Sequence, residues 1–415
     1  MINSITLLGS SSGRNAGDAA LIAGIIDSVD AACGKEVLWE IPTIKPSYIR
    51  DNYRGRTQPI SMLPWAGSVK MFGIPTYRSI HRTDMSLIFD AILFDRSLYN
   101  PLFNYLSTVS LLLPAAKKKG KLLGYFNVGV GPITTPAGRT MLRKLTDEMD
   151  FITVRDQDSF KILMDIGVKN PRVLVTADAA LTMASSTDER TEEILRSAGF
   201  SSKEDILAIN VSKYIDTWSG AGTEPMGKEK FVALYSAALN KALKKIEAPV
   251  LFICTQVHDI PLTRAIMEAT KGAPKVGIIT NERHNHYDIK GVLGKVSLLC
   301  GMRLHATILA SAGLTPVLGL PHQPKVLHYF RTLNLEDRIM TFKDFSEDAF
   351  AAFLVKGWDE RAKIRATLER TIPESKRRAL LAAELVSALD KGEDIGHAIT
   401  RIGQSMTGKA ANSGN

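Results

Sequence analysis

Short apolar runs alternate with amphipathic helical patterns through the first part of the chain. "SITLLG" reads as a buried strand, and "NAGDAALIAGIIDSVDAA", which follows it, has the periodicity of a helix. The alternation continues through the strand-like runs "KEVLWEIP", "KLLGYFNVGVGPI" and "DFITVRD". Strands that alternate with helices predict an α/β domain built on a parallel sheet.

A polar stretch that begins at Ala184, "ASSTDERTEEILRSAGFSSKED", interrupts this pattern, and a second alternation follows it. We therefore predict an α/β fold with two Rossmann-like parallel-sheet domains that face a cleft. The N-terminal domain is predicted over residues 1–185 and the C-terminal domain over 200–345. C-terminal helices are predicted over 346–392 and a disordered tail over 409–415.

The composition is that of a globular protein, with 415 residues, 45% of them hydrophobic and 23% charged. No stretch approaches the roughly 20 apolar residues that a membrane span needs. The N-terminus has no basic n-region or small-residue cleavage site, so we expect a cytoplasmic protein. Cys33, Cys254 and Cys300 are widely spaced and odd in number, which disfavours a disulfide framework and a zinc site.

The formal net charge of +9 favours anionic partners, which include phosphorylated small molecules, nucleic acid and acidic membrane surfaces. Aromatic residues make up 7% of the chain and do not interleave with basic ones, which disfavours nucleic acid. The run "KKKGK" at 117–121 is typical of a solvated helix end. Peripheral contact with the cytoplasmic face of the membrane is the alternative interpretation of that run.

The turn "GSSSGRNAGDAAL", which starts at Gly9, follows a strand and opens a helix. Its backbone N–H groups are expected to point outward at the positive end of that helix, where they suit an anion or a sugar. Asn15, Gly17 and Asp18 are therefore candidate substrate-binding residues. The turn matches neither G-x-G-x-x-G nor a P-loop, and an ordinary tight turn explains it equally well.

Two further strands end in candidate residues, because ligands of α/β sheets bind beyond the carboxyl ends of the strands. Gly131 ends the strand of "VGVGPI", and Arg155 ends that of "DFITVRD". We expect Arg155 to point into the crevice. The structural alternatives are a loop that needs glycine, and a capped helix preceded by a surface arginine.

The segment "CGMRLHATILASAG" is the most informative one. Its strand ends at Gly301, and we expect Arg303 and His305 in the loop that leads to the next helix. Arginine offers a planar fork for carboxylate or phosphate, and histidine is a natural general acid or base near neutral pH. The loop "LPHQPKV" adds His322 and Lys325 at the same edge of the sheet.

Weaker candidates end other strands of the second domain. Lys213 follows its first strand, and His258 follows the strand "PVLFIC". Both would face the cleft. His284 and His286 in "NERHNHYD" lack the carboxylate or cysteine arrangement that demands a metal, so we predict no metal site there.

Four motifs occur in the order in which the polysaccharide pyruvyl transferase family carries them: "NAGDAAL", "GVGPI", "DFITVRDQDSF" with "VTADAAL", and "GMRLHATILASAGLTPVLGLPHQPKV". The chain resembles that family over most of its length. The resemblance implies a fold similar to GT-B, with the N-terminal domain on the acceptor side and the C-terminal domain on the donor side. It also implies transfer of a pyruvyl group from phosphoenolpyruvate to a sugar hydroxyl as a ketal, on a polysaccharide or its lipid-linked precursor. Arg303 and His305 match the family's basic pair, and Arg155 matches its middle-motif arginine. Where relatives carry a glycine-rich turn, this chain has "IFDAILFDRSLY".

The chemistry of that donor agrees with the candidate residues. Phosphoenolpyruvate carries a carboxylate and a phosphate, for which Arg155, Lys213 and Arg303 are expected to converge across the cleft. His305 is the candidate general acid, and we expect neither a cofactor nor a metal. The alternatives are a GT-B glycosyltransferase that uses a nucleotide sugar, and a non-catalytic module that binds anionic glycan or nucleic acid.

Overall fold

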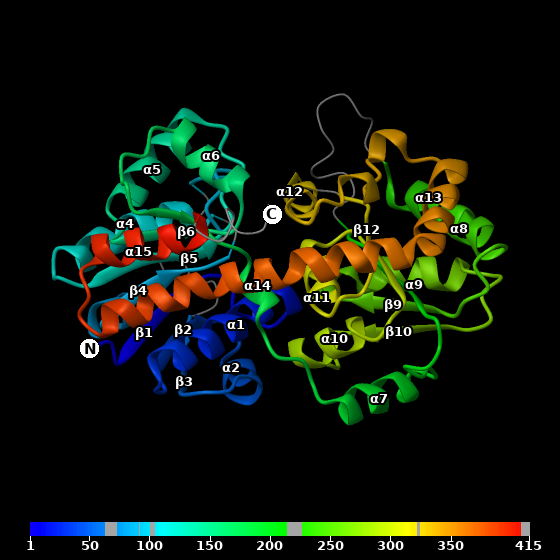
Figure 1. The fold of residues 1–415 in the computed structure, drawn as a ribbon, viewed down its shortest axis with the longest axis horizontal. Helices are drawn as coiled ribbons and strands as arrows, with labels where there is room; N and C mark the ends of the chain where they lie inside the picture. Colours follow the sequence, from blue (N-terminus) through cyan, green and yellow to red (C-terminus); the bar gives the residue numbers. More distant parts are fainter. Residues whose placement is uncertain (63–72, 91, 100–103, 214–225, 322–323, 408–415) are drawn as a thin grey trace. The chain divides into compact units, whose positions relative to one another are not determined.

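Two parallel sheets, one in each of two units, organise the chain in the computed structural model (Figure 1). The first unit comprises Met1–Gly13, Asp18–Met183 and Ser375–Asn415, and the second comprises Arg14–Gly17 and Ala184–Glu374. The chain thus changes unit at the start of the polar stretch, and it returns to the first unit within a long helix, α14 (Arg361–Asp390). The structure describes residues 1–62, 73–90, 92–99, 104–213, 226–321 and 324–407. The predicted disordered tail and His322 lie outside these ranges.

The sheet of the first unit has seven strands in the order β3-β2-β1-β4-β5-β6-β7. All neighbouring strands pair in parallel. The strand β3, "TQPIS", has no apolar run, which explains why the hydrophobic pattern does not predict it. The strand bounds are β1 Ser4–Leu8, β2 Leu38–Thr43, β3 Thr57–Ser61, β4 Met85–Ile88, β5 Leu122–Val128, β6 Phe151–Val154 and β7 Val173–Val175.

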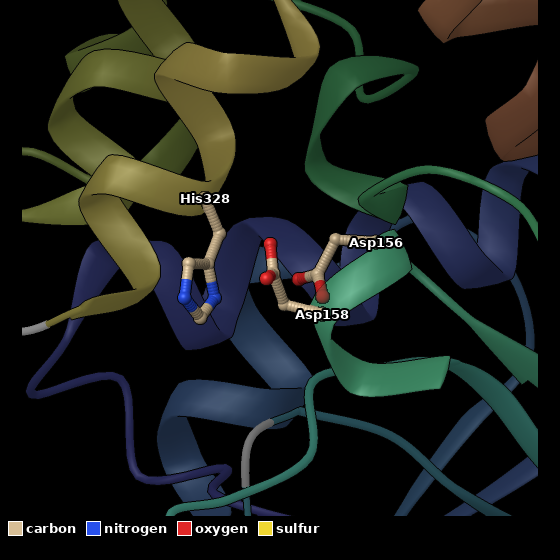
Figure 2. Close-up of side chains that lie close together, drawn as sticks. All are labelled: Asp156, Asp158 and His328. Carbon is tan, nitrogen blue, oxygen red and sulfur yellow. The ribbon is translucent and has the colours of Figure 1, made fainter. Parts of the chain in front are cut away.

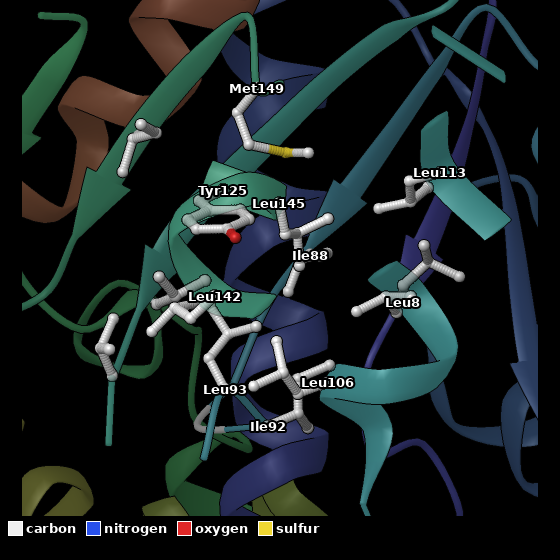
Figure 3. Close-up of a cluster of buried hydrophobic side chains, with 14 of the residues drawn as sticks. Leu8, Ile88, Ile92, Leu93, Leu106, Leu113, Tyr125, Leu142, Leu145 and Met149 are labelled. Atoms are coloured by element: carbon white, nitrogen blue, oxygen red, sulfur yellow. The ribbon is translucent and has the colours of Figure 1, made fainter. Parts of the chain in front are cut away.

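Helices cover this sheet, and two of them, α4 and α5, bury the core shown in Figure 3. Leu106 and Leu113 of α4 and Leu142 and Leu145 of α5 are buried against strand residues such as Tyr125. Each fully buried leucine contributes roughly 1.5–3 kcal/mol. The helices of this unit are α1 Ala16–Cys33, α2 Pro46–Asn52, α3 Ile74–Arg82, α4 Tyr105–Lys117, α5 Pro136–Asp147, α6 Gln157–Asp165 and α15 Ile395–Thr407.

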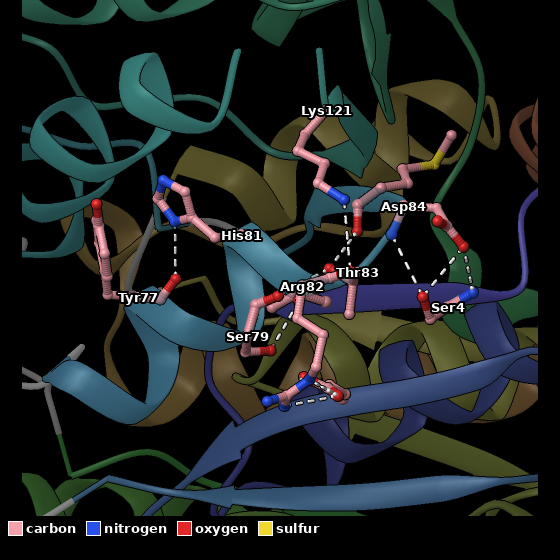
Figure 4. Close-up of polar contacts among 11 residues, drawn as sticks. Ser4, Tyr77, Ser79, His81, Arg82, Thr83, Asp84 and Lys121 are labelled. Atoms are coloured by element: carbon pink, nitrogen blue, oxygen red, sulfur yellow. Dashed lines mark hydrogen bonds and ion pairs between the residues drawn. The ribbon is translucent and has the colours of Figure 1, made fainter. Parts of the chain in front are cut away.

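Polar contacts tie the amino edge of the same sheet together (Figure 4). The backbone N–H of Ser4 donates to Oδ2 of Asp84 over 3.0 Å. Nη2 of Arg82 donates to the carboxylate of Glu40 over 2.7 Å, and Nζ of Lys121 donates to the carbonyl of Arg82. These bonds stitch β1, β2 and β4 at the edge opposite to the carboxyl ends of the strands.

The sheet of the second unit has the order β10-β9-β8-β11-β12, again with parallel pairs throughout. The strand order reverses between β8 and β11, which is where an open α/β sheet places a ligand. The prediction of two parallel-sheet α/β domains is confirmed. The strand bounds are β8 Leu207–Asn210, β9 Val250–Cys254, β10 Val276–Thr280, β11 Leu298–Gly301 and β12 Val317–Gly319.

The helices of the second unit include one that the sequence does not predict. The predicted loop at Lys325 is wrong, because α12 begins at Pro324 and Lys325 lies in its first turn. Proline is pre-organised for the first position of a helix, which explains the early start. The helix bounds are α7 Asp188–Ser197, α8 Lys228–Leu243, α9 Ile260–Ala269, α10 His286–Leu293, α11 Leu304–Ala312, α12 Pro324–Thr332 and α13 Glu347–Asp359.

Candidate active site

The reversal point of the second sheet is held by Asn210, a fully buried residue at the end of β8. Its Nδ2 donates to the carbonyl of Ile253 over 2.8 Å. Its Oδ1 accepts from the backbone N–H of Arg303 over 3.1 Å. One amide therefore links three neighbouring strands and fixes the backbone from which Arg303 projects.

Arg303 is fixed a second time by an ion pair with Asp259. It precedes α11, and its Nε and Nη2 donate to Oδ2 and Oδ1 of Asp259 over 2.7 and 2.8 Å. Asp259 is 0% exposed and lies at the start of α9, where the helix dipole favours a carboxylate. The backbone N–H of Lys213 donates to the same carboxylate over 3.0 Å. A bidentate pair of this kind holds a guanidinium in one orientation.

His258 precedes Asp259 and lies among positive charges. The pKa of its exposed imidazole is below the ordinary value, first because of partial burial and then because of Lys213 and Arg14, with a smaller contribution from Arg303. Asp259 acts in the opposite direction. Lys213 and Arg14 are exposed. Arg14, Lys213, Arg303 and His258 form what we call the basic cluster.

The segment Arg14–Gly17 joins the second unit through backbone bonds. The N–H of Ala16 donates to the carbonyl of Thr255 over 2.7 Å, and the carbonyl of Arg14 accepts from the N–H of Val257 over 3.1 Å. Nδ2 of Asn281 donates to the same carbonyl over 2.9 Å. Arg14 is therefore anchored on the loops that follow β9 and β10.

The first backbone N–H groups of α1 form hydrogen bonds within the protein. Asn15 forms a bridge with Gln256, and its Oδ1 accepts from the N–H of Gly17 over 2.9 Å. Since the N–H of Ala16 is also used, the first two amides of the helix do not have the outward role that the sequence suggests. The binding roles of Asn15, Gly17 and Asp18 stay predictions, and Asp18 lies in the first turn of α1.

His305 lies in the first turn of α11 rather than in the preceding loop, and it is 8% exposed. A Cβ atom on Gly17 would lie 2.3 Å from Nδ1 and 2.4 Å from Cβ of His305. The imidazole is thus packed directly on the first turn of α1, at a position that only glycine allows. Its neighbour Arg303 belongs to the basic cluster, so both members of the predicted pair lie at the carboxyl edge of the second sheet.

Arg155 lies in the first unit and is buried among carboxylates. Its Nη1 donates to Oδ2 of Asp178 over 3.1 Å, and its Nε lies 3.5 Å from Oδ2 of Asp156. Burial acts to lower the pKa of this guanidinium, but Asp178 and Asp156 raise it above the ordinary value overall. Asp156 also caps α6 by accepting from the N–H of Ser159, and Figure 2 shows it beside Asp158 at the start of that helix. The donor-binding role of Arg155 stays a prediction.

The remaining predicted residues have structural explanations as well. Gly131 has a φ of 95°, which glycine adopts readily, and an added Cβ would lie 2.8 Å from Cδ1 of Ile162. Its N–H donates to the carbonyl of Leu93 over 2.8 Å. Lys325 is half-buried in α12. Their roles in binding stay predictions too.

One residue of the basic cluster, Arg14, is not among the sequence candidates. Arg14 is visible in the glycine- and serine-rich turn, but an arginine in a loop has no distinguishing pattern. Asp259 is adjacent to His258, yet a carboxylate does not suggest an anion site until its pairing with Arg303 is seen.

A family model described as polysaccharide pyruvyl transferase matches residues 15–324. The match includes every residue of the proposed site except Arg14 and Lys325. A comparison with curated proteins finds no match.

Solved structures are similar in fold at low sequence identity. UDP-GlcNAc 2-epimerase from Neisseria meningitidis bound to UDP-GlcNAc has a TM-score of 0.59 and 12% identity, over 93% of this chain and 99% of that chain. HepE from Anabaena in complex with UDP-glucose has a TM-score of 0.54 and 10% identity, over 98% and 99%. MnaA from S. aureus with UDP has a TM-score of 0.57 and 13% identity, over 93% and 95%. The similarity to the GT-B fold class is confirmed.

Proposed function

This chain belongs to the polysaccharide pyruvyl transferase family, and we propose that it moves a pyruvyl group from phosphoenolpyruvate to a sugar hydroxyl, forming a ketal. The acceptor is a saccharide unit of a polysaccharide or of its lipid-linked precursor. The observation that carries the proposal is the basic cluster beside His305. One edge of one sheet thereby offers cations for the carboxylate and phosphate of the donor and a histidine for proton transfer.

The basic cluster suits a small ligand with a carboxylate and a phosphate. The charge of Arg303 is balanced in part by Asp259, whereas Lys213 and Arg14 add two exposed cations. Lysine binds phosphate as a point charge, and arginine binds carboxylate or phosphate through its planar fork. Asp259 has a positioning role, because it holds the guanidinium that faces the donor.

The reaction needs a proton donor, and we assign this role to His305. A proton moves from a general acid to the methylene carbon of the donor, and an acceptor hydroxyl adds to the neighbouring carbon and gives up its proton, which restores the acid. The bond from that carbon to the phosphate oxygen then breaks, a second hydroxyl adds to the same carbon and closes the ketal, and its proton passes to the departing phosphate. His305 is the general acid of the first step, and the cations stabilise the departing phosphate.

The proposal requires neither a metal nor a cofactor. Treatment with EDTA should leave turnover unchanged. Loss of activity with EDTA and its recovery with one divalent ion would contradict this part of the mechanism.

The test of the function is release of inorganic phosphate from phosphoenolpyruvate in the presence of a panel of glycans. Wild type should release phosphate only with an acceptor, and the product should gain the mass of a ketal-linked pyruvyl group. Arg303→Met should raise the apparent Kd for phosphoenolpyruvate strongly, since a bound anion loses a fixed partner; the loss is roughly 2–5 kcal/mol. Donor affinity equal to wild type in a folded Arg303→Met protein would remove Arg303 from the site.

A glycosyltransferase that uses a nucleotide sugar is the second candidate, because the similar solved structures hold UDP or UDP sugars. A diphosphate would suit the same cations. Thermal unfolding with each donor separates the two candidates, since a ligand at 100 times its Kd stabilises a protein by about 2.7 kcal/mol. Protection by UDP-glucose but not by phosphoenolpyruvate would favour the glycosyltransferase.

A further inference from the structure

Helix α4 is apolar on two sides. Leu106 and Leu113 face the core of the first unit (Figure 3). On another side, Leu111 is 72% exposed, whereas the adjoining Leu112 packs against the core. A surface helix that has only one partner usually carries polar residues on its outer side. The outer side of α4 is therefore unusual for a helix that is exposed to water.

A groove adjoins this outer side, between α4 and α5. Its volume is about 840 Å³. Apolar side chains from both helices form much of its lining, together with Tyr99, which is 75% exposed. Those apolar residues are Pro114 of α4 and Pro136, Ala137, Met141 and Leu145 of α5. We call the outer side of α4 and this groove the α4–α5 face.

Positive charges border the α4–α5 face at the end of α4. Lys118 and Lys119 are exposed directly after the helix. Nζ of Lys121 donates to the backbone carbonyl of Arg82, as Figure 4 shows. A carbonyl does not neutralise the positive charge of the lysine. Lys117, in contrast, pairs with Asp150.

Helix α5 adds one exposed cation that lines the groove, Lys144. The acidic residues at its end are Asp147 and Glu148, which line the groove. The carboxylate of Asp147 accepts from the backbone N–H of Lys169, so it is engaged within the protein. Lys118, Lys119, Lys121 and Lys144 thus border or line the α4–α5 face, against the two carboxylates of Asp147 and Glu148. The face combines exposed apolar side chains with more positive than negative charges.

We propose that the α4–α5 face binds an anionic phospholipid membrane. Side chains such as leucine and tyrosine enter the headgroup boundary, while neighbouring lysines are attracted by the negative surface potential. The excess of cations distinguishes this partner from a second copy of the chain, because two copies meeting through this face would bring like charges together. Binding there would bring the enzyme to a surface where a lipid-linked sugar is held.

Co-sedimentation with vesicles tests this proposal without donor or acceptor, so its result does not depend on the proposed reaction. The full chain is mixed with vesicles of equimolar phosphatidylcholine and phosphatidylglycerol, and with vesicles of phosphatidylcholine alone. Wild type should partition to the first kind and should be released by salt. Lys118→Gln with Lys119→Gln should lower partitioning about 30-fold, as expected for two lysines near an anionic surface.

Leu111→Glu should lower partitioning at least about tenfold, because it removes an apolar side chain that membrane binding would bury. Leu380→Glu is the matched control: Leu380 lies on α14 of the same unit and is 38% exposed. Circular dichroism shows whether each variant is folded. Absence of wild-type binding to anionic vesicles would overturn the proposal, as would equal binding by wild type and Leu111→Glu. A dimer that Leu111→Glu dissociates, without vesicle binding, would assign the face to a second copy instead.

Discussion

Gly17 and His305 are in contact so close that no other residue fits at position 17. The predicted distance from an added Cβ to the Cβ of His305 is 2.4 Å, so rotation of the imidazole cannot relieve the overlap. The segment Arg14–Gly17 and α11 are thereby packed together, and the general acid of the proposed reaction rests on the turn that also carries Arg14. The position of the proposed general acid therefore depends on a residue that has no side chain.

Gly17→Ala should therefore displace His305 and reduce turnover. Overpacking of this kind costs about 1–3 kcal/mol, of which the better helix propensity of alanine returns at most about 1 kcal/mol. Thermal unfolding and phosphate release measure the two effects. Gly294→Ala is the control, because its added Cβ would make only ordinary contacts of 3.4 Å. Equal turnover in Gly17→Ala and wild type would show that the position of His305 is not critical.

Replacement of His305 by Gln should lower turnover roughly 10²-fold, as expected when a general acid is removed. The amide retains much of the volume of the imidazole, so the packing on Gly17 should be disturbed less than by alanine. The affinity for phosphoenolpyruvate should change little, since the cations that bind it are intact. Phosphate release at saturating donor is the measurement. If a folded His305→Gln protein turned over at the wild-type rate, the proton donor would have to be another residue, with His258 the next candidate.

Asp259→Asn should destabilise the protein and weaken donor binding together. It leaves the guanidinium of Arg303, whose side chain is 14% exposed, without its carboxylate. Removal of one partner from a buried pair costs roughly 3–5 kcal/mol. Urea unfolding measures this, and Glu204→Gln is the control. Glu204 pairs with Lys275 over the same 2.7 Å, but both side chains are substantially exposed, so the loss there should be roughly 0–1 kcal/mol. Equal losses in the two variants would contradict the positioning role of Asp259.

The sequence predicts the strands and the ligand edge well because both depend on local patterns. Apolar runs identify β8, β9 and β11, and the rule for parallel sheets places Arg303, His305 and Lys213 at their carboxyl ends. Which carboxylate pairs with which arginine cannot be predicted in this way. Arg155 and Arg303 each closely follow a strand, and the pattern does not tell which carboxylates come beside them.

The ion pairs of the site, which the sequence does not predict, join residues that are distant along the chain. Asp178 lies 23 residues after Arg155, and Asp259 lies 44 residues before Arg303. Only the folded chain brings each pair together. The backbone of Asp90, after β4, is a further feature that the hydrophobic pattern does not predict: its φ of 69° is a conformation that glycine adopts easily and aspartate tolerates.

The titration of His258 reports directly on the basic cluster. Positive neighbours disfavour the imidazolium form, so Arg14→Met should raise the pKa of His258, because one of those charges is removed. Binding of phosphoenolpyruvate should raise it as well, since a bound anion favours the charged ring. NMR titration of the His258 ring measures both shifts. Arg50→Met, at an exposed arginine on α2, is the control and should leave the titration unchanged. A His258 pKa that does not respond to the donor would place the ligand elsewhere.

His286 should make the protein sensitive to acid. It is fully buried at the start of α10, and burial lowers its pKa to about 3. In the unfolded chain the group titrates near its ordinary value of 6.5.

Between these two values the unfolded state binds a proton that the folded state does not, so the free energy of unfolding falls as the pH falls below 6.5. From pH 7 to pH 5 this one group accounts for a loss of about 2 kcal/mol. His286→Gln should lose less stability over that interval in urea unfolding, even if it is less stable at pH 7. Tyr287→Phe alters the adjoining ring, which is tilted by 37° against that of His286, without removing a group that titrates in this range, so it should keep the wild-type loss. Parallel losses in His286→Gln and wild type would show that the acid sensitivity arises from other groups.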